Sequence, residues 1–302
     1  MKMARMLQTM TLLLLLWVLL GLLGWFWGAA WWLLLGMLLL AVVHVPLMAL
    51  EFAMQRHIGR NDPSPQPVAR EVLRAWAAEA VGAVRLFAWE MPWRWRRYAD
   101  HLPADAAGRR GLILVHGFVC NRGLWNPWWP RLGAAGVPCM ALNLEPVFGS
   151  IEAYVPLIET AVQRMRAATG KPPLLVAHSM GGLALRAWLR HGGDCEGGEA
   201  RVHRVITIGT PHHGTWLGRF GLAANTRQMR WHSPWLTELA AHEPADRYRR
   251  FTCFHGHCDN IVFPCSTATL PGADNRHLRG HAHIHMLRHP AVLAEVLRRL
   301  QD

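Results

Sequence analysis

One serine inside an apolar stretch constrains the fold of this chain more than any other feature. Residues 177–183 read Ala-His-Ser-Met-Gly-Gly-Leu and follow the apolar residues 174–176, which predict a buried strand. A serine on a tight turn from strand to helix takes an unusual backbone conformation that lifts its Oγ clear of the sheet. The neighbours two positions away must be small, and Ala177 and Gly181 are. Ser179 is therefore a candidate nucleophile.

The segments beside this turn predict donors for an oxyanion. A helix expected from about 182 to 190 directs its N-terminal N–H groups toward Ser179. Upstream, the apolar residues 111–115 predict a strand that runs into His-Gly-Phe. We expect the backbone N–H groups of Phe118 and Met180 to form the oxyanion hole.

Candidates for an acid and a base lie downstream. Residues 251–256 predict another strand, and Asp259 follows in its loop, where a carboxylate can orient a histidine. The segment Gly-His-Ala-His-Ile-His-Met-Leu then precedes a helix expected from about 290 to 300, and it offers His281, His283 and His285 as the base.

These motifs resemble the α/β-hydrolase superfamily, and more narrowly its bacterial lipases and esterases. The resemblance covers roughly residues 110–300 and includes 205–214, which are similar to the strand and Gly-Thr-Pro-His-x-Gly turn of lipases. It implies a mostly parallel sheet flanked by helices and a triad in the order serine, aspartate, histidine. In this family the histidine often lies three or four residues before the apolar pair that opens the last helix. That spacing favours His283, with the Gly280-His281 register as the competitor.

The expected chemistry is acyl transfer to water. A serine hydroxyl is a poor nucleophile at neutral pH, so the imidazole of His283 must accept its proton. Asp259 would fix the tautomer of that ring and stabilise its charged form. This mechanism requires no metal and no organic cofactor. A zinc site is not predicted, because the six cysteines show no paired C-x-x-C spacing and Cys253, His255, His257 and Cys258 divide between strand and loop.

The amino-terminal segment predicts a membrane anchor. No Lys, Arg, Asp or Glu lies between Arg5 and Glu51. A span needs about 20 apolar residues, so we expect a transmembrane hairpin with spans at about 7–27 and 31–50 and a hinge at residues 28–30. A cleaved signal peptide is the alternative, since Lys2 and Arg5 precede the apolar run. Positive residues flank both ends of the hairpin, so both ends are expected in the cytoplasm of a bacterial cell.

The remaining chain predicts one connector and one domain. Residues 51–108 read as a polar connector with an amphipathic stretch near 68–89, and residues 109–302 as the hydrolase domain. The formal charge of +12 comes almost entirely from arginine. Without a nucleic-acid motif, anionic membrane lipids are the expected partners of this charge, with the Trp-Arg-Trp-Arg-Arg segment 93–97 as an interfacial patch.

Between the motifs, strands and helices are expected to alternate. Residues 137–144 predict a strand, and residues 151–169 a helix capped by Ser150 and ended at Gly170. Residues 211–249 carry tryptophans without an evident strand, as a lid, an acyl pocket or a pair of surface helices would.

Taken together, the sequence predicts a membrane-anchored serine hydrolase that acts on a small-molecule or lipid carboxylic ester. Two alternatives stay open. A thioesterase or acyltransferase would use the same triad, and a hydrolase-like domain could bind a lipid or partner without catalysis. The sequence says nothing about the oligomeric state.

Overall fold

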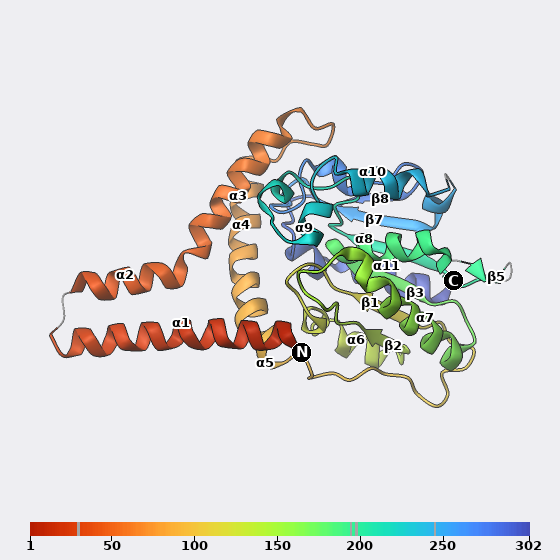
Figure 1. Cartoon of the computed structure of the whole chain (residues 1–302), viewed down its shortest axis with the longest axis horizontal. Helices are drawn as coiled ribbons and strands as arrows, with labels where there is room; N and C mark the ends of the chain where they lie inside the picture. The colour runs from red at the N-terminus through yellow and green to blue at the C-terminus, as the bar shows by residue number, and fades with distance from the viewer. Residues whose placement is uncertain (29–30, 194, 197–198, 245) are drawn as a thin grey trace.

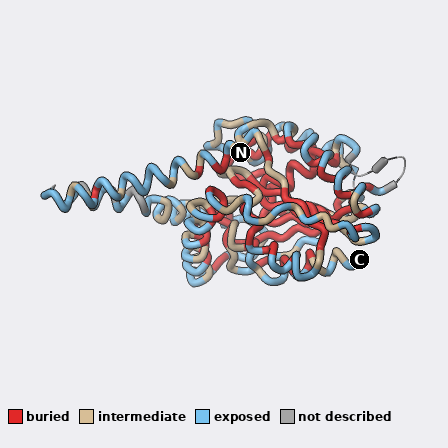
Figure 2. Tube along the Cα trace, turned by 90° about the horizontal axis from the view of Figure 1, so that it is seen from below, coloured by how far each residue is buried: buried red, intermediate tan, exposed pale blue. Residues whose placement is uncertain are grey.

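The computed structural model describes residues 1–28, 31–193, 195–196, 199–244 and 246–302. The chain forms a helical arm at its amino terminus and a body built around one sheet (Figure 1). The arm is largely exposed, whereas the strands of the body are buried (Figure 2).

The sheet is parallel throughout, with the strand order β2-β1-β3-β6-β7-β8. Its strands are β1 Leu112–Val115, β2 Cys139–Ala141, β3 Leu174–His178, β6 Arg204–Ile208, β7 Phe251–His255 and β8 Asp274–His277. A separate antiparallel pair consists of β4 Cys195–Glu196 and β5 Glu199–Ala200. Parallel strands need crossover connections, and the helices of the body supply them.

Helices cover both faces of the sheet. The α-helices of the body are α6 Trp129–Ala134, α7 Val155–Thr169, α8 Met180–Trp188, α9 Ala224–Gln228, α10 Pro234–Ala241 and α11 Pro290–Gln301. Side chains alternate along a strand, so each strand contributes to two cores. In β1, Ile113 packs with α7 and α8, whereas Leu112 packs with α6 and α11. This parallel sheet flanked by helices is the fold that the sequence predicted.

Most of the predicted elements are confirmed, with shifted ends. The predicted strands 174–178 and 251–256 are β3 and β7. The helix 151–169 begins as a 3-10 turn, Ile151–Tyr154, and ends at Gly170 with φ of +68°. Its cap is also present, because the Ser150 side chain accepts the N–H of Glu152. The strand expected at 137–144 is shorter, since only residues 139–141 pair with β1.

The arm consists of α1 Lys2–Phe26, α2 Trp31–Val42 and α3 His44–Ile58 (Figure 1). Within the described part of the chain, α1 is the one helix long and apolar enough to cross a membrane. The expected second span, 31–50, is divided: α2 ends at Val42 and α3 continues past residue 50. Of the predicted hinge, residues 29–30 lie outside the described residues.

The first two turns of α1 belong to the body. Met3 and Leu7 are buried against Met91 and Leu86, and the backbone N–H of Lys2 donates to Glu145 at 2.7 Å. Beyond them, large apolar side chains from Met10 to Trp27 are exposed.

The segment before β1 also lies on the body. It contains α4 Ala69–Ala83, the π-helical turn Val84–Glu90 and α5 Met91–Trp93. Phe52 of α3 and Ala75 of α4 share a small buried cluster with Ala282, a residue of the loop before α11. Helices α3 and α4 therefore pack against loops at the other end of the chain.

Candidate active site

Ser179 lies on a strained turn between β3 and α8. Its φ of 53° and ψ of −131° fall where residues with a side chain are rarely found. Two hydrogen bonds hold the turn: the N–H of Ser179 donates to the carbonyl of Ile208 at 2.9 Å, and the Thr210 hydroxyl donates to the carbonyl of Ser179 at 2.8 Å. The end of β6 and the residues that follow it thus hold Ser179 in this conformation.

Glycines allow the backbone to close around this serine. A Cβ on Gly117 would lie 2.7 Å from the Cβ of Ser179, and one on Gly181 would lie 2.6 Å from the carbonyl oxygen of His116. Both distances are shorter than real Cβ contacts. The small residue predicted at position 181 is therefore required because the end of β1 touches the start of α8.

His283 and Asp259 form a buried pair. The distance from His283 Nδ1 to Asp259 Oδ2 is 2.9 Å, and both side chains are almost fully buried. The other carboxylate oxygen, Oδ1, accepts the N–H groups of Ile261 and Val262 at 2.9 and 2.8 Å. At Gly209, whose φ is +56°, a Cβ would lie 3.0 Å from His283 Nδ1. A side chain there would crowd the pair and would also be strained by the positive φ.

The charge of Asp259 controls the titration of His283. Burial disfavours a charged imidazole, but the adjacent carboxylate outweighs that effect and raises the pKa of His283 above its ordinary value. The Nδ1 contact with Asp259 leaves Nε2 available to another group.

The histidine next to Ser179 brings the two parts together. The rings of His178 and His283 have centroids 4.6 Å apart, and His178 Nε2 lies 3.3 Å from the carbonyl oxygen of His283. Among the described residues, no hydrogen bond joins the Ser179 hydroxyl to His283. Contacts of this kind often shorten only when a substrate is bound.

Of the two expected oxyanion donors, Phe118 lies in the loop after β1 and Met180 is the first residue of α8. Within the described residues, the N–H groups of Phe118 and Met180 have no acceptor in the protein, as a pair awaiting an oxyanion requires. His116 braces the loop: its Nε2 accepts the N–H of Leu144 at 2.9 Å, so its Nδ1 carries the proton and donates to the carbonyl of Gly117 at 2.8 Å. Burial lowers the pKa of His116 to about 4, which keeps this ring neutral.

The competing histidines lie elsewhere. His281 and His285 stack on each other with centroids 4.4 Å apart, and His281 Nδ1 lies 2.9 Å from the carbonyl of Arg279. In the part of the chain that the structure describes, neither ring contacts Asp259. His212, the histidine of the Gly-Thr-Pro-His-x-Gly segment, is buried with its Nε2 3.0 Å from the Thr207 hydroxyl.

Apolar side chains are exposed beside the oxyanion loop, in the insertion 211–249 and along the arm. The rings of Phe118 and Phe148 meet edge to face with centroids 5.9 Å apart, and Phe148 is half exposed. Within the insertion 211–249, Phe220 and Leu222 are 64% and 81% exposed. A further apolar cavity of about 940 Å³ lies between α1, α3 and the end of α4.

Sequence reasoning did not identify the acidic residues behind His283. Glu79 of α4 accepts backbone N–H groups directly after His283, and Glu51 of α3 accepts a hydrogen bond from Asn260. A signal existed for Glu79, which is the only charged residue in the Ala-rich stretch 75–84.

Comparison with known proteins adds a family and a fold. The model of the alpha/beta hydrolase family matches residues 112–270. Among solved structures, lipase B of Aspergillus fumigatus is 20% identical with a TM-score of 0.55, over 67% of this chain and 55% of that protein. Lipase BlEst2 of Bacillus licheniformis, in its mature form, is 17% identical with a TM-score of 0.55, over 66% of this chain and 95% of that protein. The search of curated proteins gives no match. The chain thus spans about half of the first lipase and nearly all of the second.

Proposed function

The chain belongs to the alpha/beta hydrolase family, and we propose that it is a membrane-anchored serine hydrolase that cleaves carboxylic esters with an apolar acyl group. The observation that carries this proposal is the strained turn at Ser179 beside a buried His283–Asp259 pair. A hydroxyl held in this way next to an imidazole and a carboxylate is suited to nucleophilic attack on a carbonyl.

In the first step, Ser179 Oγ attacks the ester carbonyl while His283 Nε2 accepts its proton. The contact of Asp259 with Nδ1 at 2.9 Å fixes the tautomer and stabilises the imidazolium that forms. The protonated ring then donates to the leaving alcohol. An acyl-enzyme remains on Ser179.

The oxyanion is stabilised by the backbone N–H groups of Phe118 and Met180. Removal of one such donor costs about 3 kcal/mol in comparable enzymes. Water attacks the acyl-enzyme by the reverse proton path, with His283 as the base. These residues supply every proton transfer that the two steps need.

The surroundings support an apolar acyl group. Phe118 belongs to the oxyanion loop, and its ring meets the half-exposed ring of Phe148 edge to face. Exposed apolar side chains near a reactive group favour a substrate with matching surface.

We further propose that α1 and α2 form the anchor. The 17 residues of α1 from Met10 to Phe26 extend about 26 Å, close to the thickness of a bilayer core. Helix α2 has 12 residues and extends only about 18 Å, so it would need α3 or a shallow insertion to complete a hairpin. Lys2 and Arg5 in the first turns of α1, and Arg56 and Arg60 at and just beyond the end of α3, favour a cytoplasmic body.

The activity is tested by labelling the full chain in detergent with a fluorophosphonate, followed by a series of esters of increasing acyl length and their thioesters. We expect Ser179→Ala to abolish labelling and to lower kcat by about 10⁴-fold or more. Ser266→Ala, which removes a hydroxyl that donates to Asp62 and belongs to no triad residue, is the matched control. An unlabelled parent, or a folded Ser179→Ala that keeps its turnover, contradicts the proposal.

The orientation is tested separately with alkaline phosphatase fused after residue 302, because that reporter is active only outside the cytoplasm. We expect an inactive fusion in the membrane fraction. Strong reporter activity would indicate a translocated body.

A further inference from the structure

The backbone directly after the proposed base is held by two side chains from other parts of the chain. Three consecutive N–H groups are involved. Asn260 Oδ1 accepts the first, from His283, at 3.4 Å. The Glu79 carboxylate accepts the next two, from Ile284 at 2.8 Å and from His285 at 2.9 Å. Each oxygen of that carboxylate takes one N–H, so a single side chain fixes two adjacent peptide planes.

Glu79 is an unusual residue for its location. It lies on α4, before the segment matched by the family model, and only 2% of it is exposed. A carboxylate buried to this extent costs free energy unless its oxygens are satisfied. Its hydrogen-bond partners are the N–H groups of Ile284 and His285, and these satisfy both carboxylate oxygens in the interior.

A second contact from the same region supports the first. Glu51 of α3 accepts a hydrogen bond from Asn260 Nδ2 at 2.7 Å, and the other amide atom of Asn260 accepts the His283 N–H. Glu51 thereby orients the amide on one side of His283, while Glu79 holds the chain on the other. Both acidic residues come from helices that continue from the proposed anchor.

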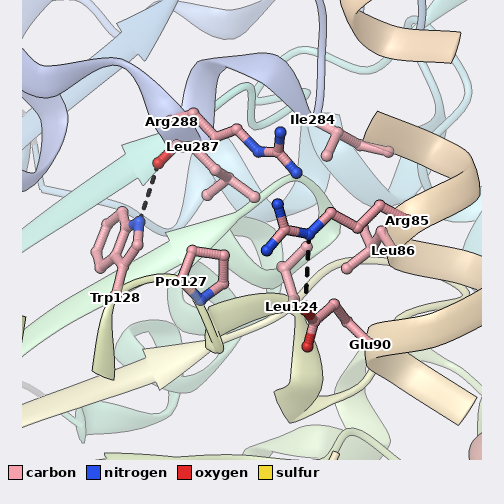
Figure 3. A pocket seen from close by; sticks show the side chains of 9 residues that line it. All are labelled: Arg85, Leu86, Glu90, Leu124, Pro127, Trp128, Ile284, Leu287 and Arg288. Carbon is pink, nitrogen blue, oxygen red and sulfur yellow. Dashed lines mark hydrogen bonds and ion pairs between the residues drawn. The ribbon is translucent and has the colours of Figure 1, made fainter. Parts of the chain in front are cut away.

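The far side of this turn is also fixed (Figure 3). The indole Nε1 of Trp128 donates to the carbonyl of Leu287 at 2.9 Å. Leu287 and Ile284 of the turn face Leu86 and Leu124 across a small cavity. The turn is thus held from two sides, and Glu79 accepts the two peptide N–H groups that directly follow that of His283.

We propose that Glu79 is a positioning residue: its carboxylate fixes the main chain after His283 and so holds the imidazole against Asp259 and toward Ser179. This inference rests on the proposed function. Glu79 has no contact with the reacting atoms, and acts only through the peptides that it binds. Loss of the carboxylate would let the turn relax, and displacement of a catalytic group by about 1 Å can cost roughly 100-fold in rate.

The test compares three variants of the full chain. Glu79→Ala removes both acceptors. Glu79→Gln keeps one acceptor and places an NH₂ group against the other N–H. Glu71→Ala is the matched control, because Glu71 lies on the same helix and contacts the same end of the chain, but through the side chains of Arg279 and His257.

We expect Glu79→Ala to lower kcat and the rate of fluorophosphonate labelling by about 100-fold, with KM nearly unchanged. Glu79→Gln should fall between it and the parent, and Glu71→Ala should stay within about twofold of the parent. Loss of stability alone would also lower the apparent kcat at unchanged KM, so kcat is calculated per active site from the end point of fluorophosphonate labelling. The rate constant of labelling is the readout that an unfolded fraction would not change, because such a fraction lowers only the end point. A folded Glu79→Ala with the kcat of the parent overturns the inference, as does an equal loss in Glu71→Ala.

Hydrogen exchange of the peptide 281–289 gives a second measurement that needs no substrate. Exchange at Ile284 and His285 should rise in Glu79→Ala and not in Glu71→Ala. Unchanged exchange contradicts the inference even when activity falls. A parent that the probe does not label contradicts the proposed function instead, so the two failures are distinguishable.

Discussion

The buried ion pair between Arg186 and Glu243 allows a quantitative test of how the insertion is attached to the body. Both side chains are fully buried. Arg186 Nε and Nη2 donate to the carboxylate at 3.0 and 2.5 Å, Nη1 donates to the carbonyl of His212 at 2.7 Å, and Nη2 donates to the Tyr248 hydroxyl at 3.2 Å. The pair therefore joins α8, which begins at the proposed nucleophile, to the insertion 211–249.

Removal of one partner leaves a charge without compensation in the protein interior. Glu243→Leu should therefore lower the free energy of unfolding by about 3–5 kcal/mol. For a domain of this size that corresponds to a fall in Tm of roughly 6–20 °C. In the double variant Arg186→Met, Glu243→Leu no charge remains, and the cost should fall to about 1–3 kcal/mol, which reflects the lost bonds of His212 and Tyr248.

Urea unfolding of the parent, Arg186→Met, Glu243→Leu and the double variant in one detergent, followed by tryptophan fluorescence, measures this double-mutant cycle. Asp105→Ala, which breaks an exposed ion pair with Arg109, is the control and should change stability by less than about 1 kcal/mol. The reasoning is refuted if Glu243→Leu lowers the free energy of unfolding by less than about 1 kcal/mol. It is also refuted if the loss in the double variant equals the sum of the losses in Glu243→Leu and Arg186→Met.

Three further predictions concern the site. His283→Ala should lower kcat by several orders of magnitude, whereas the kcat of His281→Ala and of His285→Ala should stay within a few-fold of the parent. The reason is that, of these three histidines, only His283 contacts Asp259 within the described residues. An inactive His281→Ala beside an active His283→Ala would reverse the assignment. The Asp259 carboxylate raises the pKa of His283, so kcat/KM should fall as the pH drops through a value above 6.5. The residual activity of Asp259→Asn should show this loss at lower pH. A pH profile that does not shift in Asp259→Asn would contradict the electrostatic effect of Asp259 on His283. Burial raises the pKa of Glu79 from 4.5 to about 7. Between these pH values the folded state keeps a proton that the unfolded state releases. As the pH rises from 4.5 to about 7, Glu79 should therefore lower the free energy of unfolding by about 3 kcal/mol. Glu79→Gln should remove that part of the slope in urea unfolding, and equal slopes would show that Glu79 is not the group responsible.

The elements that the sequence predicted well are those with strong local signals. An unbroken apolar run followed by Ser179 and two glycines leaves few alternatives to a buried strand, a tight turn and a helix. The helix 151–169 was equally predictable from the sequence, because its apolar residues repeat with the helical period and both of its ends carry capping residues. Such elements depend little on what they pack against.

Strand β8 shows why other elements were not foreseen. Its sequence, Asp-Asn-Arg-His, has no apolar alternation, since the strand lies at the edge of the sheet and its side chains are largely exposed. Backbone pairing with β7 alone defines it. No periodicity in the sequence can report a strand of this kind.

Glu79 and Glu51 were missed for a different reason. Each lies on a helix about 200 residues away from the loop that it contacts, so no spacing rule connects them. As the only charged residue in the Ala-rich stretch 75–84, Glu79 stood out in the sequence, but the sequence did not indicate its partner. Its partner became identifiable once the fold placed α4 beside the turn after His283.

These contacts bear on where a soluble form of the protein can begin. Composition suggested a boundary near residue 109, and the match to the family begins at residue 112. A chain cut there would lack Glu51, Glu79 and the buried side chains Met3 and Leu7. The carboxylates hold the turn of His283, while the two apolar residues complete the core beside Met91. Replacement of the exposed leucines between Met10 and Trp27 by polar residues would remove much of the apolar surface of α1 and keep all of these contacts. Solubility should therefore be sought by changing the outer face of α1, and not by deleting the segment before β1.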